Sequence, residues 1–140
     1  MKKLIIGVIV SAVLGLGFIV TCVNHVTLNH VGVAYNSVNG SLVVQSNAGW
    51  YVTSPMTQCI ELSILPTAVT IPSHAKVINT KFVKLNVEHI KDFIALQGFS
   101  YSLSQMQNDI LMGYAFSGQE YNFLTIVQQP GIENSPKSNR

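Results

Sequence analysis

The stretch that decides the architecture is Leu4–Val23, which reads LIIGVIVSAVLGLGFIVTCV and contains no charged residue. About 20 apolar residues, rising roughly 1.5 Å each in a helix, span a hydrocarbon core of roughly 30 Å. Lys2 and Lys3 lie directly before this segment. Basic residues stay on the cytoplasmic side of a membrane helix. The sequence therefore predicts a single-pass protein of the inner (cytoplasmic) membrane, with residues 1–3 in the cytoplasm, a transmembrane helix over 4–23, and a domain in the periplasm or outside.

Two other interpretations of this segment stay open. A cleaved signal peptide has a shorter apolar stretch of about 7–15 residues and an A-x-A-like site, whereas here the run is longer and no such site follows. In a lipoprotein signal Cys22 would carry the lipid, although Thr21 is a poor residue directly before such a cysteine. The retained helix is the favoured interpretation.

Small residues within the segment are spaced four apart, at Gly7, Ser11 and Gly15. They share one face of a helix, and this small-xxx-small pattern lets two helix backbones approach closely in lipid. Glycine and serine are also common in membrane helices, so the spacing has a chance explanation as well. We expect this face to pack anchors together if it has a role.

The charge balance of the chain argues against a nucleic-acid partner. The 140 residues include eight Lys or Arg and six Asp or Glu, and the hydrophobic share is 48%. Lys2 and Lys3 are two of the eight basic residues, so six basic and six acidic residues remain after the anchor. Nucleic-acid binding normally requires a clustered basic face, and none is predicted here.

Short strands separated by turns follow the anchor. Val31, Val33 and Tyr35 alternate as in a half-buried strand, and Asn39-Gly40 predicts a hairpin turn. Further strands are predicted at Leu42–Val44, Gly49–Val52, Gln58–Ile64, Val69–Ile71 and Val77–Val87. Gly40 and Gly49 are expected to hold turns, and Pro55 to stop the strand that contains Trp50.

The pattern changes to helical spacing near residue 87. One helix is predicted from the apolar residues Val87, Ile90, Phe93, Ile94 and Leu96, with Gly98 as its C-terminal cap. A second helix is predicted to begin at Ser102 or Ser104, with Ser104 and Gln107 forming a capping box. Its apolar face comprises Met106, Ile110, Leu111 and Tyr114, and Tyr121–Val127 is a last helix or strand. Together these elements predict an α+β domain with a largely antiparallel sheet and two to three helices.

Residues suited to catalysis or metal binding do not gather in the sequence. His25, His30, His74 and His89 are scattered, and Cys22 and Cys59 are expected to be separate thiols. Glu88 and Asp92 fit a solvated helix face, and no nucleophile-elbow, zinc-protease, P-loop or dinucleotide motif is present. We therefore expect no enzyme activity, no cofactor and no metal.

One pattern resembles a known family. Val31-Gly32-Val33-Ala34-Tyr35-Asn36, then Gly40, Gly49-Trp50-Tyr51 and Ser54-Pro55, is similar to the opening of an SPFH (band 7) domain. This family comprises stomatins, prohibitins, flotillins and the bacterial HflK and HflC proteins. Ala48 and Tyr51 replace the proline and histidine of the family's Pro-Gly-Trp/Phe-His-like turn. The resemblance covers about Val26–Leu85 and is weaker as far as Val127.

The resemblance implies an SPFH-like domain over residues 24–128. The composition of the residues after it, with Pro, Gly, Ser, Asn and Lys, predicts a flexible tail over 129–140. The resemblance also implies a mixed sheet with helices, no catalytic residues and assembly into rings or cages on the membrane. HflK and HflC regulate a membrane-bound AAA protease from outside the cytoplasmic membrane. The family's long coiled-coil helix is expected to be missing from this chain, which would make it a short member.

Three functions follow as expectations. The first is a membrane-anchored scaffold that self-associates and contacts lipid, and whose partners include a membrane protease or other SPFH proteins. In it Trp50 lies near the edge of the sheet, at the membrane surface. The second is a phage or mobile-element regulator that binds a host protease or SPFH complex, or blocks membrane entry. The third is a lipoprotein-type or secreted binding module.

Overall fold

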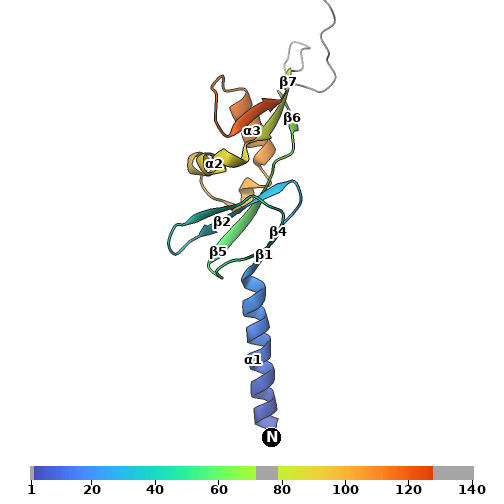
Figure 1. The fold of residues 1–140 in the computed structure, drawn as a ribbon, viewed down its shortest axis with the longest axis vertical. Coiled ribbons are helices and arrows are strands. Elements are labelled where there is room, and N and C mark those ends of the chain that lie inside the picture. Colours follow the sequence, from blue (N-terminus) through green and yellow to red (C-terminus); the bar gives the residue numbers. More distant parts are fainter. Residues whose placement is uncertain (1, 72–78, 128–140) are drawn as a thin grey trace, which may run out of the picture.

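The protein is an elongated α+β molecule with an N-terminal helix that projects from one end of a compact domain (Figure 1). The computed structural model describes residues 2–71 and 79–127. The α+β class, the apolar N-terminal helix and the antiparallel pairing expected from the sequence are all confirmed. The expected tail over 129–140 lies outside the described residues.

Helix α1 covers Lys2–Thr21 and ends two residues earlier than the predicted boundary at Val23. The Thr21 hydroxyl donates to the carbonyl of Phe18 at 2.7 Å, and the Cys22 amide donates to the carbonyl of Ile19 at 3.0 Å. Val23 then begins a strand, because its backbone pairs with another strand and cannot also continue the helix. A single residue, Cys22, therefore connects the helix to the domain.

The first sheet is a two-stranded ribbon of β1 (Val23–Val26) and β4 (Gly49–Val52). The strands are antiparallel, with Val23 opposite Val52 and Val26 opposite Gly49. Strand β1 was not predicted from the sequence. Its four residues, VNHV, are too few for an alternating apolar pattern to distinguish a strand from a linker.

The second sheet contains β2 (His30–Asn36), β3 (Leu42–Gln45) and β5 (Thr57–Ser63), in the order β3-β2-β5. The predicted hairpin between β2 and β3 is confirmed. Gly40 has a φ of 69°, and its amide donates to the Asn36 carbonyl at 2.9 Å. A left-handed residue at this position explains the glycine.

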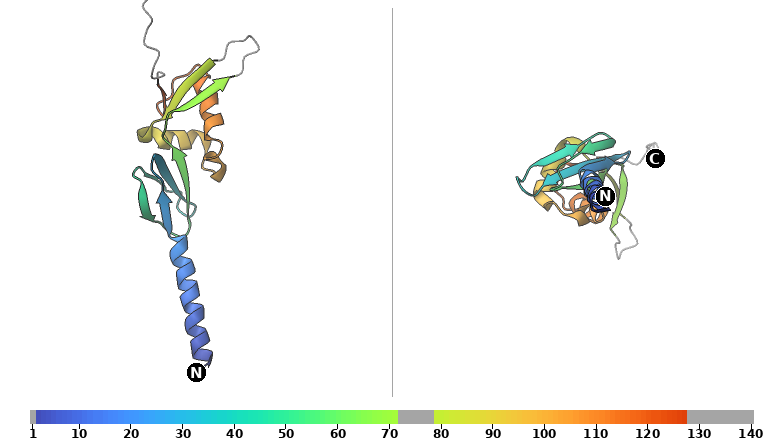
Figure 2. Two further views of the ribbon diagram at one scale, coloured as in Figure 1. Left: turned by 90° about the vertical axis from the view of Figure 1, so that its right-hand side faces the viewer. Right: turned by 90° about the horizontal axis from the view of Figure 1, so that it is seen from below.

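The third sheet contains β6 (Thr67–Ile71), β7 (Asn79–Leu85) and β8 (Leu124–Val127), in the order β6-β7-β8. It lies at the end of the molecule farthest from α1 (Figures 1 and 2). Of the predicted strand at 77–87, residues 77 and 78 lie outside the described part of the chain. Of the last predicted apolar run, Tyr121–Val127, only Leu124–Val127 forms a strand, β8, and no part of the run is helical.

Two α-helices and two 3₁₀ turns complete the described part of the domain. The 3₁₀ turn η1 (Val87–His89) leads into α2 (Ile90–Gln97), and η2 (Tyr101–Leu103) precedes α3 (Gln107–Ala115). Gly98 ends α2 as predicted, with a φ of 78° and its amide bonded to the Ile94 carbonyl. Leu96, however, is 57% exposed. At 3.6 residues per turn it lies about 120° around the helix from Ile90, off the buried face.

The capping box predicted at Ser104 does not form. The N-terminal cap of α3 is Met106, which makes no side-chain cap bond and is half exposed. The Ser104 hydroxyl donates to the Tyr101 carbonyl within the preceding turn. Gln107 points inward instead, where its Oε1 accepts from the Ser63 amide at 2.8 Å and its Nε2 donates to the Ser63 carbonyl at 2.6 Å. A tertiary contact has replaced the local cap.

One continuous hydrophobic core joins the second and third sheets. Its residues come from strands of both sheets, from α2 and α3, and from the segments that connect them; they include Val31, Val33, Ile60, Leu62, Val69, Val83, Leu85, Ile90, Phe93, Leu111 and Phe123. Phe93 and Phe123 pack with ring centroids 5.3 Å apart. The ribbon of β1 and β4 lies outside this core, between it and α1 (Figure 1).

Candidate functional site

Helix α1 is long and apolar enough to cross a membrane, and it is the one such helix in the described part of the chain. The large apolar side chains from Leu4 to Val20 are between 51% and 74% exposed. The helix that carries them projects away from the domain (Figure 2). An exposed apolar helix of this length is unfavourable in water and favourable in a bilayer.

Gly7, Ser11 and Gly15 all lie on this exposed helix. A Cβ atom added to Gly7 or Gly15 would meet nothing within 4 Å. The face that they share is therefore open to an approaching helix. The sequence placed these residues on one face, and the structure leaves that face uncovered.

The junction between α1 and the domain is held by backbone bonds. The Thr53 amide donates to the Cys22 carbonyl at 2.7 Å, directly beyond the pairing of Val23 with Val52. The end of the helix is thus fixed to the end of β4 as well as to β1. Because both strands meet the helix, the ribbon is the part of the domain nearest to it (Figure 1).

One face of the ribbon carries exposed apolar and aromatic side chains. We call Val23, His25, Trp50 and Val52 the outer ribbon face. Trp50 is 76% exposed and Val52 87% exposed. The His25 and Trp50 rings lie 4.6 Å apart, centroid to centroid, across the two strands. Trp50 is on a sheet edge, as expected from the sequence, since β4 pairs with β1 alone among the described strands.

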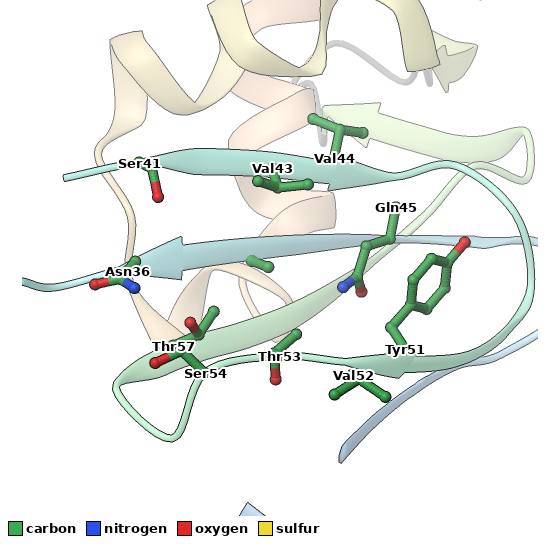
Figure 3. A pocket seen from close by; sticks show the side chains of 11 residues that line it. Asn36, Ser41, Val43, Val44, Gln45, Tyr51, Val52, Thr53, Ser54 and Thr57 are labelled. Carbon is green, nitrogen blue, oxygen red and sulfur yellow. The ribbon is translucent and has the colours of Figure 1, made fainter. Parts of the chain in front are cut away.

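The opposite face of the ribbon borders a cavity of about 300 Å³, which we call the hairpin groove. Its walls come from the β2–β3 hairpin, from β4 and from the start of β5 (Figure 3). Gly49 begins β4 with a φ of 146°, and Pro55 lies in the exposed turn between β4 and β5. These predicted turn residues therefore shape the wall of the groove without lining it.

Gln45 is the buried polar residue of this groove, at 5% exposure. Its Oε1 accepts a hydrogen bond from Asn24 Nδ2 at 2.8 Å. Gly32 on β2 makes room for it, because a Cβ there would lie 2.7 Å from Gln45 Oε1 and 2.5 Å from Val26 Cγ2. Sequence reasoning missed Gln45. The signal was weak: a single amide that ends the apolar strand LVVQ.

Tyr51 forms the aromatic wall of the groove. Its hydroxyl donates to the Asn47 carbonyl at 2.7 Å, which fixes the position of the ring. Figure 3 shows this ring beside the Gln45 amide, with Thr53 farther along the same wall. The groove therefore has one fixed ring and one fixed amide side by side.

Cys22 and Cys59 are free thiols, as expected from the sequence. Burial raises the pKa of the Cys59 thiol, and a hydrogen bond with Thr53 opposes this rise. A raised pKa lowers the thiolate fraction at neutral pH and so lowers reactivity.

The titratable residues of the described chain do not assemble into a metal site. No group of three or more His, Cys, Asp or Glu side chains lies together in residues 2–71 and 79–127. His89 pairs with Asp92 at 3.0 Å on the surface, and Glu88 is exposed nearby. His74 is outside the described residues.

Comparison with protein-family models gives no match, and comparison with curated proteins gives none either. The SPFH resemblance therefore rests on the short pattern between Val31 and Pro55.

Proposed function

We propose that this protein is a single-pass membrane-anchored scaffold that self-associates and organises membrane or membrane-protein complexes by protein contact. One observation carries this proposal: an exposed apolar helix, long enough to span a bilayer, is joined through a single residue to a folded domain. Such a molecule holds a binding surface at a fixed place above the membrane.

The energetics of α1 support a membrane location. Burying one large apolar side chain stabilises a protein by about 1.5–3 kcal/mol. Twelve such side chains on α1 are exposed, and the domain offers them no surface to pack against. A bilayer removes all of them from water at once, so the helix functions as an anchor.

The charges directly before α1 support an orientation of the protein in the membrane. Lys2 and Lys3 precede the helix, and basic residues favour the cytoplasmic side. We therefore place the N-terminus in the cytoplasm and the domain in the periplasm or outside the cell.

The open small-residue face supports self-association. Without a hydrophobic driving force between helices in lipid, close backbone packing favours association. Gly7 and Gly15 leave space for a second helix. Lipid and a second copy of this chain are the partners that we propose, and a membrane protease or an SPFH protein is the wider partner class.

The arrangement of strands supports an SPFH-like plan. The pattern that resembles the family occupies the β2–β3 hairpin and β4, directly after the anchor. Short helices then follow, as the resemblance implies, but every described strand pair is antiparallel, whereas the resemblance implies a mixed sheet. A scaffold of this kind acts by presenting surfaces, which fits a domain whose described His, Cys, Asp and Glu side chains form no group of three or more.

Crosslinking in native membranes, followed by gentle extraction and size analysis, tests the proposal. We expect an oligomer for the natural chain and a shift towards monomer for Gly15→Leu. Gly17→Leu is the matched control, because Gly17 also faces open space and lies about 120° from the centre of the Gly7–Ser11–Gly15 face.

A strictly monomeric natural chain would overturn the scaffold proposal. Equal oligomer size for all three proteins would assign assembly to the domain instead of the anchor. Co-purification of a host protein without self-association would favour the regulator expected as the second function.

A further inference from the structure

We propose that the hairpin groove binds a neutral, polyhydroxylated ligand, such as a sugar headgroup, through the Gln45 amide and the ring of Tyr51. Nothing in the scaffold function requires this site. Its place beside the bilayer rests on the proposed anchor, but its chemistry does not.

The first argument is an unused donor on a buried side chain. Gln45 is 5% exposed, and its Oε1 is occupied by Asn24. Its Nε2 has no hydrogen-bond partner within residues 2–71 and 79–127. No fully enclosed side-chain nitrogen or oxygen of these residues lacks a partner, so Nε2 is reached from the groove. Figure 3 shows the amide end pointing into the space between β3 and β4.

A donor in this position favours an oxygen ligand. The Gln45 N–H is open to the groove, and a ligand hydroxyl or ether oxygen can accept from it in place of water. The hydrogen bond from Asn24 holds the Gln45 amide in place before a ligand arrives, and Gly32 leaves the room that the amide occupies. The amide is therefore preorganised, and its ordering costs little on binding.

The second argument is the absence of charge. The described residues that line the groove include no Asp, Glu, Lys, Arg or His. A charged group that entered this half-enclosed space would lose water without gaining an ionic partner, which is unfavourable. The groove therefore selects a neutral ligand.

The third argument is the supply of hydroxyls. Ser41 and Thr57 line the groove on opposite walls. Within the described chain their hydroxyls bond to no other group. Each hydroxyl can both donate and accept, which matches the hydroxyls of a sugar or polyol. Tyr51 adds a fixed flat ring, against which the C–H face of a sugar ring can pack.

The position of the groove suggests two sources for this chemistry. Thr53 lines the groove, and its amide bonds to the carbonyl of Cys22 at the end of α1. With α1 in a bilayer, the groove lies at the height of the lipid headgroups. The headgroup of a neutral glycolipid and a free glycan present the same hydroxyls there, and an experiment with two arms separates them.

The test uses the full chain in phosphatidylcholine nanodiscs. Glucoside and maltoside detergents are avoided because they carry sugar headgroups like the proposed ligand. In the lipid arm the discs contain monoglucosyl diacylglycerol. In the soluble arm plain discs are titrated with methyl β-glucoside and with cellobiose. The side-chain amide signals of ¹⁵N-labelled glutamine and the ring signals of tyrosine report binding at Gln45 and Tyr51.

We expect these signals to shift in at least one arm. A response in the lipid arm alone assigns the site to a glycolipid headgroup, and a response to the soluble sugars assigns it to glycans in general. Each lost neutral hydrogen bond weakens binding about two- to tenfold. Gln45→Leu and the double variant Ser41→Ala/Thr57→Val should both weaken it, and the double variant should keep the fold because these hydroxyls have no bonds within the described chain.

Thr125→Val is the matched control, since Thr125 is exposed on the distal strand β8. No shift in either arm would overturn the proposal. So would an equal response to glucuronate, or equal weakening by the control. The oligomer size of the same samples is measured in parallel, so failure of sugar binding and failure of self-association are seen separately.

Discussion

The side chain of Gln107 makes a tertiary contact and does not cap helix α3. It lies at the start of α3 at 5% exposure and bonds both the amide and the carbonyl of Ser63 at the end of β5. The sequence suggested a cap between Ser104 and Gln107, because the spacing is right for one. Spacing cannot reveal that a backbone 44 positions earlier would offer the same side chain two better bonds.

Gln107→Leu should lower the free energy of unfolding by about 2–4 kcal/mol, because two part-buried backbone groups lose their partner. Ser104→Ala is the control and should change it by less than about 0.5 kcal/mol, since Ser104 makes no cap. Thermal unfolding of the full chain in nanodiscs, followed by circular dichroism, measures both. Equal losses for the two variants would mean that the capping box forms after all.

Gly32 and Gly113 form a second contrast at this scale. Gly32→Ala should lower the free energy of unfolding by about 1–3 kcal/mol, because the new methyl overlaps Val26 and Gln45. Gly113 lies in α3, where an added methyl group would meet nothing within 4 Å, so Gly113→Ala should raise it by about 0.5–1 kcal/mol through helix propensity. The same unfolding measurement applies. A stabilised Gly32→Ala would contradict the close approach of β1 and β2.

At the scale of elements, the ribbon of β1 and β4 is the part of the fold that could be predicted least well from the sequence. Strand β4 and the hairpin were predictable because Gly40, Gly49 and alternating apolar residues mark them. Strand β1 was not, because four residues carry too little periodicity. Its pairing with β4 closes a span of more than twenty residues, and sequence alone gives no register for such a contact. The hairpin groove depends on this pairing, and so it could not be predicted either.

The outer ribbon face should contact the membrane surface. Trp50 is the one tryptophan of the chain, so its fluorescence reports this face directly. In vesicles, lipids brominated near the headgroup should quench it more strongly than lipids brominated near the chain ends, because tryptophan prefers the interface.

A variant with the tryptophan moved to the distal sheet, Trp50→Phe with Ile126→Trp, serves as the control. Ile126 is exposed on β8, far from α1 (Figure 1). The tryptophan fluorescence of this control variant should be quenched by aqueous iodide and not by brominated lipid. Strong iodide quenching of Trp50 itself, without lipid quenching, would place the outer ribbon face in water.

At the scale of the whole molecule, the long apolar helix was the most predictable feature and the proposed partner surfaces the least. Leu4–Val23 indicates a membrane span by composition alone, and in the structure the helix covers Lys2–Thr21, two residues earlier at each end than predicted. The α+β class followed from strands that precede helices in the chain. Division into three sheets did not, because the sequence does not say which strands pair. The proposed self-association depends on surfaces that only a partner completes.

The intact mass of the protein purified from membranes tests the retained anchor. We expect the mass of the full 15.3 kDa chain, because the helix has no cleavage site that favours processing. Cys22→Ser should leave the membrane fraction unchanged. Loss of residues 1–21 with a lipid on Cys22 would instead identify a lipoprotein.

The short junction at Cys22 has a mechanical consequence. Membrane helices tilt by about 20° on average, and the tilt adjusts to bilayer thickness. With one connecting residue and the Thr53–Cys22 bond, the domain has little freedom to swivel against its helix. A thinner bilayer that tilts the helix therefore swings the distal sheet sideways, as a lever does. With α1 as the proposed membrane anchor, the orientation of the domain would depend on local membrane thickness.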